Sequence, residues 1–103
     1  MKILFTATAK KQFLAAIEFI HADKPSAARK FKTKAEKALS KVKKFPEAGR
    51  VLPEFPELPF REVIVPPYRF FYRVKENIWI IAVWQAAQLP SYPANPEDKR
   101  FRT

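Results

Sequence analysis

The chain has 103 residues, a length typical of a single domain with a modest core. Its 20 Lys and Arg against 10 Asp and Glu give a net charge of +10, which indicates an anionic partner, either nucleic acid or an acidic protein segment, although Lys-rich surfaces also simply keep proteins soluble. A single glycine and no cysteine exclude a Gly-rich phosphate loop, disulfides and a thiolate zinc site, so we expect no metal and no cofactor.

The first half of the chain predicts a strand and two helices. Ile3-Leu4-Phe5 is a short apolar run typical of a strand added to a sheet. Thr8 is the expected N-cap of a first helix that ends near Ala22. Pro25 suits the first turn of a second helix that extends to Lys44, because apolar residues recur there three and four positions apart. The short connection predicts that the helices pack as an antiparallel hairpin.

The polar face of this second helix is strongly basic. A single acid, Glu36, accompanies the cations of the segment from Lys24 to Lys44. Like charges at helical neighbour spacing cost a few tenths of a kcal/mol per pair, so helix propensity does not favour the pattern. The lysines are therefore either a solvated face or a surface for an anionic partner, and the residues predicted to contact that partner are Lys30, Lys34, Lys37 and Lys41.

Three strands with short turns follow a Pro-rich loop over residues 46–59. β-branched and aromatic residues fill Arg61–Val65, Tyr68–Val74 and Ile78–Trp84. Connections this short permit only antiparallel neighbours, which predicts a three-strand antiparallel meander. The fold is therefore predicted to be α+β, a two-layer sandwich in which an N-terminal strand and an antiparallel helical hairpin precede the meander.

Alternation along the central strand separates two faces. Tyr68, Phe70 and Tyr72 are expected to face the helices, which leaves Arg69, Phe71 and Arg73 on an open face, where Arg61 could join them. Such a cationic surface with an aromatic neighbour suits anion binding. Alternatively, Arg69 is a structural residue that pairs with a carboxylate of a loop or of a partner.

We expect residues 1–103 to form one domain, in which residues 85–103 are a Pro-interrupted tail. The N-terminus becomes polar at Thr6, so it has no signal-peptide pattern. No apolar run approaches the length of a transmembrane helix. We therefore expect a cytoplasmic protein that does not contact a membrane.

Three phrases of the sequence resemble the RelE/ParE superfamily of bacterial type II toxins. They are Phe45-Pro-Glu-Ala-Gly-Arg50, Pro67-Tyr-Arg-Phe-Phe-Tyr-Arg-Val74 and Ile81-Ala-Val-Trp-Gln-Ala-Ala-Gln-Leu-Pro90. Their order and spacing, together with the succession of predicted elements, cover nearly the whole chain. The resemblance implies a small basic toxin that a cognate acidic antitoxin neutralises, and it favours the ParE-like branch.

The superfamily implies two targets, DNA gyrase, which ParE-like toxins bind and inhibit, and ribosome-bound mRNA, which RelE-like toxins cleave without a metal. Cleavage needs a base, an acid and cations at the phosphate. The positions that match this set are Arg61, Arg69 and Tyr92, and Gln85 and Gln88 stand where a His or Arg is expected. Gln orients a phosphate but transfers no proton, which favours binding over cleavage. A third hypothesis is a basic nucleic-acid-binding module that uses the second helix.

The remaining aromatic and imidazole side chains have simpler interpretations. His21 lies near the expected end of the first helix, where the helix dipole favours it. Trp79 and Trp84 are interpreted as core or partner-groove residues rather than base-stacking platforms. The residues predicted to contact a protein partner are Arg69, Phe71, Arg73, Gln85 and Gln88, in addition to the four lysines named above.

Overall fold

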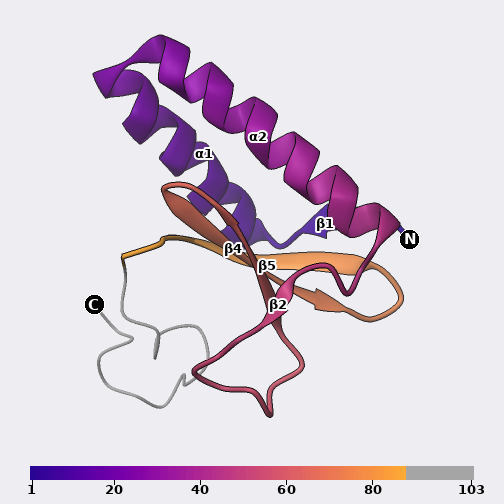
Figure 1. The fold of residues 1–103 in the computed structure, drawn as a ribbon. Helices are drawn as coiled ribbons and strands as arrows, with labels where there is room; N and C mark the ends of the chain where they lie inside the picture. Colours follow the sequence, from indigo (N-terminus) through magenta and orange to yellow (C-terminus); the bar gives the residue numbers. More distant parts are fainter. Residues whose placement is uncertain (88–103) are drawn as a thin grey trace.

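A computed structural model describes residues 1–87, in which two helices cover one face of a five-stranded sheet (Figure 1). This arrangement confirms the predicted α+β fold. The elements follow in the order β1 (Ile3–Phe5), α1 (Ala7–Asp23), α2 (Pro25–Lys44), β2 (Arg50–Val51), β3 (Arg61–Val65), β4 (Tyr68–Val74) and β5 (Ile78–Gln85).

The sheet is mixed and has the strand order β1-β5-β4-β3-β2. The meander of β3, β4 and β5 is antiparallel, as predicted, whereas β1 pairs in parallel with β5. The parallel pairing is permitted because a long connection, which includes both helices, separates β1 from β5. The additional strand β2 lies in the loop that was expected to be irregular, so five strands replace the expected four.

The two helices begin where local chemistry allows it. The hydroxyl of Thr6, not that of Thr8, accepts the 3.1 Å hydrogen bond from the amide of Ala9, so the predicted N-cap was wrong by two residues. Both threonines have side chains that suit an N-cap. Because the helix begins at Ala7, directly after the residue that follows β1, the capping position falls on Thr6. The second helix has the predicted bounds and carries Pro25 in its first turn.

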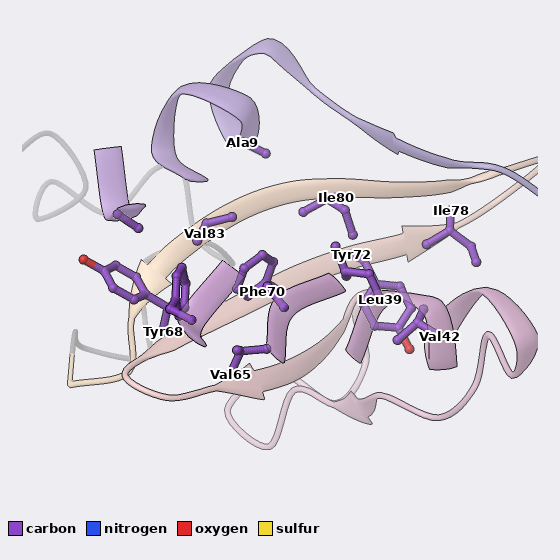
Figure 2. Packing of buried hydrophobic residues seen from close by; sticks show 13 residues of the cluster. Ala9, Leu39, Val42, Val65, Tyr68, Phe70, Tyr72, Ile78, Ile80 and Val83 are labelled. Atoms are coloured by element: carbon purple, nitrogen blue, oxygen red, sulfur yellow. The ribbon is translucent and has the colours of Figure 1, made fainter. Parts of the chain in front are cut away.

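The main core lies between the helices and the sheet, where Phe70, Tyr72, Ile78 and Ile80 are fully buried (Figure 2). Aromatic rings from α1, α2 and β4 meet there. Phe13 of α1 lies 5.5 Å from Phe70, centroid to centroid, in an edge-on arrangement, a geometry that adds about 0.5–1.5 kcal/mol to the burial term. This face of β4 is the one that alternation assigned to the core.

A side chain of α1 also protects the edge of β5. β1 pairs with β5 only as far as Ile80, so the edge of β5 continues past the end of its neighbour. The amide of Val83 donates a 2.8 Å hydrogen bond to Oε1 of Gln12. Because an unpaired strand edge invites association with other chains, this bond both orients α1 and closes part of the edge.

Candidate functional site

Arg69, the most prominent cation of the predicted site, lies in a buried ion-pair network. Its Nε donates a 2.7 Å hydrogen bond to Glu62, and its Nη2 lies 3.4 Å from Glu54 of the β2–β3 loop. The same Glu62 accepts a 2.8 Å bond from Nε of Arg50. The guanidinium also lies 5.0 Å from the ring centroid of Phe71. Arg69 is thus held by carboxylates of its own chain, which is the structural interpretation considered for it.

The face of the sheet away from the helices is therefore not open around Arg69, contrary to expectation. Arg69 is 7% exposed and Phe71 is 1% exposed. The β2–β3 loop passes over this face (Figure 1), and its Leu52 packs with Phe71 and Ala82 in a second small core. Strand alternation correctly placed both side chains on one face, but it could not show that a Pro-rich loop covers that face.

Arg61 does not join Arg69. In the β3–β4 register Arg61 lies opposite Tyr72, whereas Arg69 lies opposite Ile64, so the two guanidinium groups project from opposite faces of the sheet. Nη1 of Arg61 donates a 2.9 Å hydrogen bond to the carbonyl of Gly49. The shared cationic surface expected from the sequence is consequently not formed, and a catalytic role for either residue stays a prediction.

The hydroxyl of Tyr72 fastens the start of the loop to the sheet. It accepts a 2.8 Å hydrogen bond from the amide of Gly49 and donates one of 2.8 Å to the carbonyl of Pro46. Burial raises the pKa of Tyr72 above its ordinary value, opposed by the Gly49 hydrogen bond and the charge of Arg61. The phenol is therefore neutral near pH 7 and serves as an anchor there rather than as a base.

A groove of about 780 Å³ opens where α2 ends and the loop begins. Its position was not predicted, because its walls come from four separated segments. Phe45, 61% exposed, and Val51, 37% exposed, contribute exposed apolar side chains to its lining. Lys44 and Arg61 add two cations and Glu47 adds one acid. The remaining lining residues are Met1, Pro46, Ala48, Leu58, Pro59, Phe60 and Val74.

Gly49 and Arg50 belong to the phrase after the second helix and lie between Ala48 and Val51, which line this groove, but the sequence assigned neither of them a role. Gly49 is buried, and a methyl group added there would come within 3.0 Å of the Tyr72 hydroxyl and the Glu62 carbonyl. The only glycine of the chain is thus required by close approach rather than by an unusual backbone angle. The presence of a single glycine in the sequence was the signal that could have indicated a close contact at position 49.

The other predicted contact residues are spread over the surface. Lys30, Lys34, Lys37 and Lys41 are exposed along α2, and Arg73 is exposed on β4 beside Trp79. Gln85 is exposed at the end of β5. Gln88 and Tyr92 lie outside the described residues. Partner contacts by these residues stay predictions.

His21 and Trp84 have the local positions that their simpler interpretations require, whereas Trp79 does not belong to the core, and a partner contact by it stays a prediction. His21 lies in the last turn of α1 and is exposed. Trp84 is half-buried and meets the ring of Phe71 at 6.0 Å, edge to face. Trp79 is 39% exposed.

Two further kinds of site are not present within residues 1–87. No group of three or more His, Asp or Glu side chains in this part of the chain is placed to hold a metal ion. Neither described helix combines the length and apolar character needed to span a membrane.

Comparisons with known proteins give a consistent family. The family model described as "ParE toxin of type II toxin-antitoxin system, parDE" matches residues 3–90. Among solved structures, a chain from "Chromosomal ParDE TA system from P. aeruginosa" has a TM-score of 0.67 and 20% identity, and the match covers 82% of this chain and 95% of that one. At that identity the likeness shows the fold. None of the curated proteins compared with the chain matches it.

Proposed function

The chain belongs to the ParE toxin family of type II toxin–antitoxin systems, and from this membership we propose that it acts in the cytoplasm by binding and inhibiting DNA gyrase. One observation supports binding over RNA cleavage. Arg61 and Arg69 lie on opposite faces of the sheet, and each already donates hydrogen bonds within its own chain. A cleavage site needs its cations and its proton-transfer groups around one phosphate.

The test is expression of the chain alone in bacteria. We expect growth arrest, an SOS response and DNA breaks covalently linked to gyrase, together with inhibition of plasmid supercoiling by the purified chain. Codon-positioned mRNA breaks without DNA damage would instead favour the RelE-like endonuclease. Normal growth in the absence of an antitoxin would contradict both kinds of toxin.

We further propose that a cognate acidic antitoxin neutralises the toxin and that an apolar segment of it occupies the groove beside Phe45. Exposed apolar groups in a concave surface are typical anchor sites for a partner segment. Lys44 and Arg61 line the same groove, and basic residues beside apolar pockets complement acidic residues that flank an apolar anchor.

Phe45→Ala should weaken antitoxin binding about tenfold or more, because truncating an aromatic hot spot of an interface costs about 2 kcal/mol or more and about 1.4 kcal/mol is tenfold in affinity. Its stability should change little, since Phe45 is 61% exposed. Titration calorimetry with the cognate antitoxin measures the effect. Phe19→Ala is the matched control, because Phe19 is 67% exposed and lies outside the groove. Equal losses in the two variants, or a loss only for Phe19→Ala, would place the antitoxin elsewhere.

A further inference from the structure

The outer surface of α2 carries a continuous row of lysines, Lys30, Lys34, Lys37, Lys41 and Lys44. Their spacing of four and three residues places them on one side of the helix, one above the next. At 1.5 Å per residue the row extends over about 21 Å. The opposite side of the helix packs into the main core through Phe31, Ala35, Leu39 and Val42. Packing thus fixes the direction of the row.

The charge of this surface is one-sided and uncompensated. The helix contains eight Lys and Arg and one acid, Glu36, and all nine are exposed. The ion pairs among residues 1–87 involve Arg50 and Arg69, so no lysine of the row is neutralised by a described carboxylate. Because a mixed surface of both signs would serve solubility without this repulsion, the pattern indicates an anionic ligand.

The residues beside the row are charged or carry hydroxyl groups, and these residue types indicate the class of ligand. A shallow depression of about 380 Å³ on α2 is lined by Ser26, Arg29, Lys30, Thr33, Lys34 and Lys37, without a single apolar residue. Protein interfaces are depleted in Lys and depend on aromatic and apolar anchors. Lys, Arg, Ser and Thr are instead the side chains that contact phosphodiester oxygens. The surface therefore suits a nucleic-acid backbone better than an acidic protein segment.

The row also favours a duplex over a single strand. Proteins that hold single strands combine cations with exposed aromatic rings on which bases stack. The one aromatic residue within α2, Phe31, is buried. A straight row of about 21 Å follows roughly six base pairs at 3.4 Å each.

We propose that the lysine row of α2 is a non-sequence-specific binding surface for the phosphate backbone of double-stranded DNA. This surface meets the groove assigned to the antitoxin only at Lys44, and its activity requires neither gyrase nor an antitoxin. Such a surface would hold the toxin on DNA, the substrate of gyrase. DNA binding by α2 would therefore add a contact to the proposed function, but it does not require that the proposed function be correct.

The experiment measures binding of the purified full chain to a fluorescent duplex of about 20 base pairs, at salt concentrations from about 50 to 200 mM. The variant Lys30→Gln, Lys34→Gln, Lys37→Gln should bind at least tenfold more weakly at about 100 mM salt. Its plot of log K against log[salt] should become shallower by about 2 to 3, since each phosphate contact contributes about 0.9 to the slope. Gln preserves helix propensity, and a circular dichroism melt confirms folding.

The matched control removes the same charge elsewhere, as Lys2→Gln, Lys11→Gln, Lys75→Gln, three exposed positions outside α2. It should keep most of the affinity and the slope. Equal losses in both variants would show that only net charge matters and would overturn the proposal. So would an absence of duplex binding by the unmodified chain at about 50 mM salt. If the α2 variant lost antitoxin binding but kept duplex binding, the row would be a protein contact and the proposal would also fail.

Discussion

Replacing Glu62 with alanine is expected to lower the free energy of unfolding by about 3–5 kcal/mol, the loss typical of breaking one side of a buried ion pair. Glu62 is 1% exposed and accepts hydrogen bonds from both Arg50 and Arg69. Without it, Arg69 keeps the 3.4 Å contact with Glu54 and the 5.0 Å contact with the Phe71 ring, and it remains a nearly buried, poorly compensated cation. Urea denaturation followed by circular dichroism measures the change.

Two controls separate the buried charge from ordinary side-chain truncation. Glu54→Ala should cost at most about 1 kcal/mol, because its side chain is 25% exposed and its contact with Arg69 is long. The double variant Glu62→Leu, Arg69→Met should recover most of the loss, since it removes the cation together with its partner and fills the space with apolar atoms. If the double variant were as unstable as the two single changes added together, the network would not be the cause.

The same network shows how far sequence reasoning reached. The bounds of α2 and of the strands β3 and β4 were predicted correctly because their patterns are regular over many residues. The side of β4 that carries Arg69 was also predicted correctly. The burial of that side was not predicted, because it depends on the path of the irregular loop of residues 46–59. No periodic pattern in the sequence specifies this path.

The candidate site divides in a similar way. The exposure of the lysine row on α2 follows from helical periodicity alone, so the sequence predicted four of its five residues by name, all except Lys44. The groove beside Phe45 could not be predicted, since it joins the N-terminus, the end of α2, the loop and β4. By helical spacing Phe45 would continue the buried stripe of α2, whereas the helix ends at Lys44 and leaves this ring 61% exposed. For an aromatic residue at a helix boundary, the direction of the side chain depends on the path of the following segment, which helical spacing does not predict.

Gly49→Ala is expected to destabilise the protein by about 2–4 kcal/mol, for two reasons that act together. The added Cβ would approach the ring and hydroxyl of Tyr72 and the backbone oxygen of Glu62 within 3.0 Å, and overpacking of this kind costs about 1–3 kcal/mol. Tyr72 is fully buried between the sheet and α2 and cannot move away without disturbing the main core. Any displacement also lengthens its hydrogen bonds to Gly49 and Pro46, each worth about 0.5–1.5 kcal/mol.

The consequences of Gly49→Ala should extend to the groove, because Gly49 and Arg61 share a hydrogen bond and Pro46 and Arg61 both line it. Thermal melts measure the stability loss, and Ala48→Ser, at the exposed neighbouring residue, should change it by less than about 0.5 kcal/mol. In the surviving folded fraction, antitoxin affinity should fall as the loop shifts, while duplex binding through α2 should stay unchanged. A Gly49→Ala protein with unaltered stability would mean that the loop can leave Tyr72 freely, and the anchoring role of its hydroxyl would then be wrong.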